Sequence, residues 1–347
     1  MRYEVNDPVR LTDDGKAILA IDQSLLPNRV AYIRLETPKE MFTALKRFQV
    51  RGASCIGIFA AYAMFLQAKV FAAESQDKEN FYQMLHTFAK YLSTARPTAV
   101  NLPWALKRME RTAANNMRRS FETIIEALRK EAESIHEQNI ETCFTIANYG
   151  LVLINDGDGI LTHCNAGALA TSRYGTALGP LILGAEKGMK FSAYVDETRP
   201  RLQGSRLTAY ELTNAGVDTT LICDSMASLV MSQGKINACF VGADRVAKNG
   251  DTANEIGTAG LAILAQHYHI PFYVFCPTSS IDVTCDDGSK IEIEEREPEE
   301  IKTEFFRSPV APEEAKCYNP AIDITNAGLI TAIITEQGIN YPPYDFN

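Results

Sequence analysis

The side chains best suited to chemistry follow a series of short apolar runs in the second half of the chain. The runs occupy residues 159–163, 191–195, 219–223, 238–241 and 271–275. A thiol, carboxylates, amides and guanidinium groups come directly after them, in the segments Cys164-Asn165-Ala166-Gly167, Asp196-Glu197-Thr198-Arg199, Asp224-Ser225, Gly242-Ala243-Asp244-Arg245 and Pro277-Thr278. Groups of these kinds can transfer protons and hold an anion.

The elements that must position these groups are strands and helices in alternation. Segments long enough for a helix separate the apolar runs, at residues 171–186, 204–215, 225–233 and 258–267. Continuous apolar strands that alternate with helices indicate a parallel sheet covered on both faces. Ligands bind beyond the carboxyl ends of the strands in such a sheet, so we expect the polar segments to gather there. The acidic stretch 291–301 and the tail 319–344 are expected to pack on this sheet.

Two further local patterns bear on the site. The loop 249–258 leads into a helix, and its turn residues are expected to present backbone N–H groups to an anion. His163 adjoins Cys164 on a strand, where neighbouring side chains point to opposite faces, so no nucleophilic pair is expected from them. No Gly-x-Gly-x-x-Gly motif or Walker-type phosphate loop follows any strand.

The first 150 residues read differently, as mainly helical with a short extended start. Two short strands are expected within residues 15–36, and a helix from Pro38 capped by Thr37. Further helices are expected at 56–75 and 80–93, and a long helical stretch from Pro103 to about Ile154 with a break near Asn139. The predicted class is α/β, with a helical domain at 1–150 and a domain built on the parallel sheet at 151–347.

Composition excludes several classes of protein. The 347 residues contain 43 acidic and 34 basic side chains, and the formal charge of −9 disfavours binding to nucleic acid or an anionic membrane. No stretch reaches the ~20 apolar residues of a membrane span, and no secretory signal is evident. The eight cysteines include no Cys-x-x-Cys pair, so we expect reduced thiols in a cytoplasmic protein and no metal site.

Five motifs occur in order along the chain, and together they resemble a known family. They are Arg51-Gly52-Ala53-Ser54-Cys55-Ile56-Gly57, Arg96-Pro97-Thr98-Ala99-Val100-Asn101-Leu102, Cys164-Asn165-Ala166-Gly167, Glu197-Thr198-Arg199-Pro200 with Gln203-Gly204-Ser205-Arg206-Leu207-Thr208-Ala209, and Gly242-Ala243-Asp244-Arg245. The chain resembles the methylthioribose-1-phosphate isomerase family over about residues 15–335. That family belongs to a larger group with the regulatory subunits of a translation-initiation guanine-exchange factor.

The resemblance implies a specific activity. The family converts 5-methylthioribose 1-phosphate into the matching ketose 1-phosphate, in methionine salvage, with neither metal nor organic cofactor. Cys164 and Asp244 would be the catalytic pair. The residues implied to contact the sugar phosphate are Arg51, Gly52, Ala53, Arg96, Gln203, Asn254 and Glu255. The implied fold is a small N-terminal domain on a Rossmann-like C-terminal domain, usually in a homodimer.

The residue chemistry suits this reaction by either of two routes. Asp244, expected to be buried at a strand end, would serve as acid and base. Cys164 would act as a base at carbon 2, or shape an apolar pocket that favours a hydride shift. The alternatives for single residues are a core thiol at Cys164, a helix cap or a partner for Arg245 at Asp244, and a bond to neighbouring main chain at Gln203.

Two positions depart from the family pattern. Glu255 stands where lysine is usual, and Ser54-Cys55 stand where proline and alanine are usual. A carboxylate beside a phosphate is repulsive, so either Glu255 points away or the far end of the substrate differs. Three functions follow: a methylthioribose-1-phosphate isomerase, an isomerase of 5-deoxyribose 1-phosphate or a similar 5-modified sugar, or a non-catalytic regulatory or nucleotide-sensing protein on the same fold.

Overall fold

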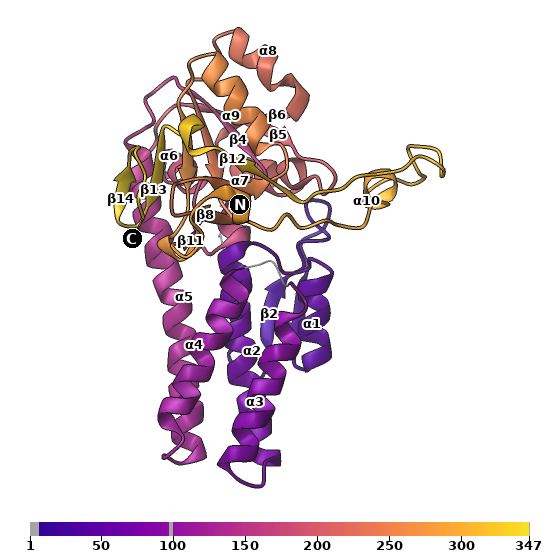
Figure 1. Ribbon diagram of the computed structural model, residues 1–347, viewed down its shortest axis with the longest axis vertical. Helices are drawn as coiled ribbons and strands as arrows, with labels where there is room; N and C mark the ends of the chain where they lie inside the picture. The colour runs from indigo at the N-terminus through magenta and orange to yellow at the C-terminus, as the bar shows by residue number, and fades with distance from the viewer. Residues whose placement is uncertain (1–6, 97–99, 347) are drawn as a thin grey trace. The chain divides into compact units, whose positions relative to one another are not determined.

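The protein has a mixed α/β fold, as the sequence predicts. The computed structural model describes residues 7–96 and 100–346 (Figure 1). These residues form two compact units, one made of residues 7–141 and 168–173 and the other of residues 142–167 and 174–346. The division differs from the predicted boundary at 150, and two domains at 1–150 and 151–347 stay a prediction.

The first unit is mainly helical with one small sheet. Its three strands are antiparallel in the order β1-β2-β3. The elements are β1 (Val9–Leu11), β2 (Ile18–Ile21), β3 (Tyr32–Leu35), α1 (Pro38–Lys46), α2 (Ala53–Glu74), α3 (Lys78–Ser93), α4 (Asn101–Asn116), and α5 (Phe121–Leu151) up to residue 141. The two predicted strands and the predicted helices after Pro38 are therefore confirmed. The predicted cap of α1 is also present, because Thr37 accepts from the Glu40 amide and the Glu40 side chain accepts from the Thr37 amide.

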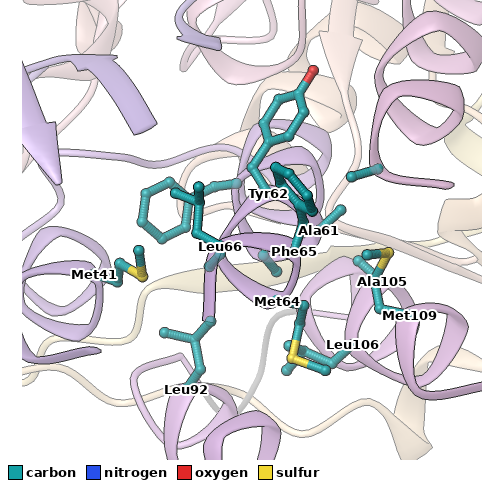
Figure 2. Packing of buried hydrophobic residues seen from close by; sticks show 14 of the residues in the cluster. Met41, Ala61, Tyr62, Met64, Phe65, Leu66, Leu92, Ala105, Leu106 and Met109 are labelled. Atoms are coloured by element: carbon teal, nitrogen blue, oxygen red, sulfur yellow. The ribbon is translucent and has the colours of Figure 1, made fainter. Parts of the chain in front are cut away.

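Helix α2 is the centre of this unit's core. It has 22 residues and is long and apolar enough to cross a membrane by length and composition, but most of it is buried inside the structure. Figure 2 shows Tyr62, Met64 and Phe65 of α2 among side chains of neighbouring elements, including Leu92 and Met109. Burial on all sides explains why α2 lacks the polar stripe of a surface helix.

The predicted break near Asn139 is wrong. Helix α5 continues through Asn139, and the interruption lies between Asn116 and Phe121. Ser120 explains the position, since its hydroxyl accepts a hydrogen bond from the Thr123 amide at 3.3 Å and so caps the new helix. Asn139 instead uses its side-chain oxygen to accept from Ser172 at 2.8 Å, which leaves the helix backbone intact.

The second unit is built on a seven-stranded sheet in the order β14-β13-β10-β7-β4-β5-β6. All neighbouring pairs are parallel except β13 with β14. The strands are β4 (Gly159–His163), β5 (Ser192–Glu197), β6 (Asp218–Cys223), β7 (Ala238–Gly242), β10 (Phe272–Phe275), β13 (Ala332–Thr335) and β14 (Gly338–Asn340). Five of them match the five apolar runs of the sequence.

Helices cover both faces of this sheet. Ile160 of β4 packs in one buried cluster with α6 and α7, whereas Leu161 packs in another with α8 and α9. Alternation of neighbouring residues between two apolar clusters is typical of a parallel sheet buried on both sides. The helices are α6 (Gly179–Glu186), the π-helix η2 (Gly204–Thr208), α7 (Ala209–Asn214), α8 (Ala227–Ser232) and α9 (Thr258–His267), with short 3-10 turns η1 (Ala168–Ala170) and η3 (Asp224–Met226).

Three predictions for this part of the chain need correction. The segment 171–186 is helical only from Gly179, because residues 165–178 form turns that are fixed by an isolated bridge between Gly167 and Gly175. The loop 249–258 contains strand β9 (Thr252–Glu255) of a second sheet, ordered β11-β8-β9-β12. The tail 319–344 does not merely pack on the main sheet, because it supplies strand β13 of that sheet.

The remaining elements belong to the second sheet and its connections. They are β8 (Arg245–Ala247), β11 (Ile281–Asp282), β12 (Ile322–Thr325), α10 (Glu300–Thr303), and the 3-10 turns η4 (Thr278–Ser280), η5 (Gly288–Lys290) and η6 (Ala327–Leu329). Strands β8 and β9 form an antiparallel hairpin that starts where β7 ends. The hairpin is therefore the element that returns the chain to the carboxyl edge of the main sheet.

Candidate active site

Cys164 lies at the carboxyl end of β4, directly after His163. It is buried, with 7% of its surface exposed, and its backbone adopts a left-handed φ of 64°. Few residues other than glycine adopt this conformation, and such outliers gather at functional sites. The Cys164 Sγ donates to Oε2 of Glu255 at 3.5 Å.

A buried polar network fixes the backbone behind this thiol. The Thr208 hydroxyl donates to the carbonyl of Cys164, and the Asn165 amide donates to Thr208 at 3.1 Å and to Glu211 at 2.8 Å. A Cβ atom added to Gly167 would lie 2.5 Å from Oε1 of Glu211, so only glycine fits there. Sequence reasoning missed the roles of Thr208 and Glu211, although Thr208 stands inside one of the recognised motifs.

Gln203 and Glu255 meet in front of Cys164. The Gln203 Nε2 donates to Oε2 of Glu255 at 2.8 Å, and Gln203 itself is 7% exposed. Gln203 precedes the π-helix η2, a type of helix that is frequent at functional sites. One alternative from the sequence is therefore wrong, because the amide of Gln203 bonds to a side chain rather than to neighbouring main chain. Glu255 points toward Cys164, and its direction relative to a substrate phosphate stays a prediction.

Asp244 follows β7, the strand that pairs with β4. Its backbone N–H donates to the Ala253 carbonyl at 2.9 Å, which ties it to the hairpin. The expectation that Asp244 is buried is wrong, because the turn between β7 and β8 leaves it exposed. It is no helix cap either, since β8 and not a helix follows it, and the guanidinium of Arg245 lies 3.8 Å from Asp282.

The amino end of α9 holds an anion that the chain itself supplies. Both carboxylate oxygens of Asp323 accept backbone hydrogen bonds, from Gly257 at 2.8 Å and Ala259 at 3.1 Å. These two N–H groups therefore face an anion, as expected, but this anion is a carboxylate of the chain and not a ligand. Asn254 lies nearby on β9, and its amide nitrogen donates to the Thr258 hydroxyl at 3.0 Å.

His163 and Asp196 form a fully buried pair beside the site. Their side chains are each 1% exposed, and Nδ1 of His163 lies 3.1 Å from Oδ2 of Asp196. The other ring nitrogen, Nε2, lies 2.9 Å from the Ile256 carbonyl. Because both nitrogens are occupied, His163 is not available to activate Cys164, in agreement with the strand geometry. Burial raises the pKa of the Asp196 carboxyl.

The other residues implied by the resemblance lie in the first unit. Gly52 precedes α2 with a φ of 95°, and a Cβ there would lie 2.3 Å from Cα of Ala170, so backbone shape alone requires this glycine. Ala53 is the first residue of α2. The Arg96 guanidinium stacks on the ring of Phe48 at 4.1 Å, and Arg51 is partly buried. Residues 97–99 of the Arg96 motif lie outside the described residues.

Over residues 7–96 and 100–346, no group of three or more His, Cys, Asp or Glu side chains is arranged to hold a metal ion. The polar groups that do meet at the carboxyl edge are a thiol and an amide, each within hydrogen-bond distance of the same carboxylate. Such a set can exchange protons with a bound molecule.

Sequence comparison confirms the resemblance. The model of the initiation factor 2 subunit family matches residues 49–342, so the chain belongs to that family. It is 56% identical to a methylthioribose-1-phosphate isomerase of Symbiobacterium thermophilum, over 97% of this chain and 94% of the relative. It is 51% identical to a 5-deoxyribose 1-phosphate isomerase of Clostridium botulinum strain Okra, over 98% and 96%.

Solved structures with this fold carry two kinds of name. The 5-methylthioribose 1-phosphate isomerase of Pyrococcus horikoshii matches with a TM-score of 0.90 at 38% identity, over 98% of this chain and 94% of that one. The delta subunit of translation initiation factor eIF-2B from A. fulgidus matches with a TM-score of 0.85, also at 38% identity, over 97% and 96%. Fold likeness alone therefore does not separate an isomerase from a subunit of a translation initiation factor.

Proposed function

We propose that this protein is an aldose–ketose isomerase that converts 5-methylthioribose 1-phosphate to 5-methylthioribulose 1-phosphate. The observation that carries the proposal is 56% identity to an isomerase of that name over nearly the whole of both chains. The site supports it, because a thiol and an acid lie at the ends of two paired strands of a parallel sheet. The enzyme belongs to methionine salvage and acts in the cytoplasm.

Cys164 and Asp244 are the proposed catalytic residues. A furanose that carries phosphate on carbon 1 opens only when its ring oxygen receives a proton, and hydrogen must then pass from carbon 2 to carbon 1. Asp244 is suited to the first step, since an exposed carboxyl can meet a ligand directly. Cys164 is suited to carbon 2, as a base or as the apolar wall for a hydride shift.

Glu255 bears on which sugar phosphate is the substrate, because the candidate sugars differ in their 5-substituent. Its carboxylate lies beside Cys164 and accepts from Gln203, so it can accept a further hydrogen bond from a sugar hydroxyl but repels phosphate. A second candidate substrate is 5-deoxyribose 1-phosphate, because a relative at 51% identity is named for that sugar. The two sugars share the phosphate and the ring and differ at carbon 5.

The proposal includes the remaining implied features. Arg51, Gly52, Ala53 and Arg96 contact the sugar phosphate together with Gln203, Asn254 and Glu255, and no cofactor takes part. Arginine is suited to the phosphate because its planar fork matches two phosphate oxygens. We also propose that the chain has a helical domain at 1–150 and a Rossmann-like domain at 151–347, and that it forms a homodimer.

Turnover of the pure protein with each sugar phosphate tests the function. NMR follows the ketose carbonyl as it forms from 5-methylthioribose 1-phosphate and, separately, from 5-deoxyribose 1-phosphate. We expect conversion of both, with the larger kcat/KM for the methylthio sugar. If neither sugar is converted, the isomerase proposal is wrong and the regulatory reading of the fold gains support.

Glu255→Lys tests the choice between the two sugars. Because the substitution exchanges the charge beside Cys164, we expect the ratio of the two kcat/KM values to change by about tenfold, or ~1.4 kcal/mol. Glu292→Lys makes the same exchange at an exposed position, and should leave the ratio unchanged. Identical ratios in wild type and Glu255→Lys would remove Glu255 from the substrate site.

A further inference from the structure

We propose that His163 and Asp196 are positioning residues that hold the Glu255–Ile256 segment against Cys164. The inference rests on the proposed function and extends it, since it assigns a role to a buried pair outside the catalytic residues. Strand register brings the pair together: His163 is the last residue of β4, and Asp196 is its direct partner on the parallel strand β5.

The hydrogen bonds of the ring determine where its protons lie. A carbonyl oxygen only accepts, so Nε2 of His163 must carry the hydrogen that is donated to Ile256. Nδ1 then accepts from a protonated Asp196, or carries a second proton toward an ionised one. Burial raises the pKa of Asp196, and its Oδ1 has no partner among the described residues. Asp196 in turn raises the pKa of His163, so the two pKa directions do not choose between the arrangements. The Oδ1 without a partner does choose, because a buried ionised oxygen without a donor is costly. It favours the uncharged arrangement, in which the Asp196 hydroxyl donates to Nδ1.

The pair thus forms a directed chain of hydrogen bonds, from Asp196 through the ring to the backbone of Ile256. Ile256 follows Glu255, whose side chain contacts Cys164. The segment is consequently held at two successive residues, by the thiol through Glu255 and by the imidazole through the next carbonyl. Because His163 and Cys164 are neighbours in sequence, both contacts with the segment come from the carboxyl end of β4.

The rest of the segment is anchored in the same way. The Ile256 amide donates to the Ala321 carbonyl at 3.0 Å, and the Gly257 amide donates to Asp323. The ring of His163 lies directly against Gly257, where an added Cβ would come within 2.7 Å of its Cε1 atom. The imidazole therefore fills the space behind the segment as well as bonding to it.

Four substitutions test the pair by activity. His163→Leu removes the donor to Ile256, and a catalytic group displaced by ~1 Å costs up to about 100-fold in rate, so we expect kcat to fall about 10- to 100-fold with KM changed by less than about threefold. His163→Gln places an amide nitrogen near the position of Nε2, and should restore kcat to within about fivefold of wild type.

Substitutions of Asp196 distinguish the uncharged pair from an ion pair. Asp196→Asn has the same shape and can donate to Nδ1, so we expect kcat within about fivefold of wild type, whereas Asp196→Ala should lose about tenfold or more. Circular dichroism and Tm confirm that each variant is folded. The proposal is overturned if folded His163→Leu matches wild type, or if the conservative variants are as impaired as the drastic ones.

Alkylation of Cys164 provides a test that needs no turnover. Iodoacetamide labelling, followed by mass spectrometry of the Cys164 peptide, should be at least about threefold faster in His163→Leu, because Glu255 no longer holds the thiol. Labelling of the exposed Cys223 should not change. An unchanged Cys164 rate refutes the positioning role. A faster rate in a protein that converts neither sugar would refute the proposed function and leave the pair supported.

Discussion

The ends of two paired strands, β4 and β7, present their reactive side chains in contrasting ways. Cys164 after β4 is buried, has a left-handed backbone, and is fixed by Thr208 behind and Glu255 in front. Asp244 after β7 is exposed, although its backbone amide is tied to Ala253. One group is preset by the fold, and the other belongs to an exposed residue whose backbone is fixed.

The difference indicates how the two groups would divide the reaction. A preset thiol costs little to align with a substrate carbon, because its position is established during folding. An exposed carboxyl meets an incoming ligand in water and loses that water only when the ligand covers it. Ligand binding would therefore change the surroundings of Asp244 more than those of Cys164.

The largest expected effect comes from removing either reactive group. Cys164→Ser and Asp244→Asn should each lower kcat about 10²- to 10⁴-fold, since each removes a group that transfers protons or shapes the reacting carbon. The rates of ketose formation measure this. Cys223→Ser and Asp218→Asn make the same exchanges at exposed positions, and should be active. Full activity in either site variant would refute its assigned role.

The next effect tests the preset side of the comparison. Gly167→Ala places a Cβ 2.5 Å from the buried carboxylate of Glu211, so the network behind Cys164 must shift. We expect the free energy of unfolding to fall by about 1–3 kcal/mol, as measured by chemical denaturation. The matched control is Gly260→Ala in α9, where nothing lies within 4 Å, and which should be neutral or slightly stabilising. Equal stabilities of the two variants would contradict a rigid support.

The smallest expected effect is on stability, and it comes from Asp323, which caps helix α9 after the β8–β9 hairpin. Burial raises the pKa of Asp323 above 3.8. A carboxyl whose pKa is higher in the folded state contributes stability that is present at low pH and lost as pH rises through that value. The free energy of unfolding of wild type, relative to that of Asp323→Asn, should therefore fall by less than about 1 kcal/mol from about pH 3.5 to about pH 7, as measured by chemical denaturation at each pH. A shift in the other direction would contradict this sign. Asp218→Asn should show no such trend.

Much of the main sheet could be predicted because its strands are continuous apolar runs. Strand β4 and helix α9 have the predicted bounds. Strand β13 was not predicted, since its four residues join the sheet only through pairing with β10, some 60 residues earlier.

The site was predicted less completely, because its contacts join distant parts of the chain. Polar residues after strands drew attention to Cys164 and Asp244. The approach of Glu255 to Cys164, 91 residues apart, depends on the β8–β9 hairpin, whose second strand lies within the predicted loop 249–258. The exposure of Asp244 depends on the same hairpin. No local pattern in the sequence indicated Asp323 as the cap of α9.

That cap has a consequence for the design of inhibitors. In many nucleotide-binding proteins a helix end attracts the phosphate of the ligand, and chemists imitate this with anionic groups. Here Asp323 already neutralises the amino end of α9, so an inhibitor that directs a phosphonate toward this helix would meet a carboxylate. A neutral or cationic group is the better choice at that end of a lead compound, with its acidic group directed elsewhere.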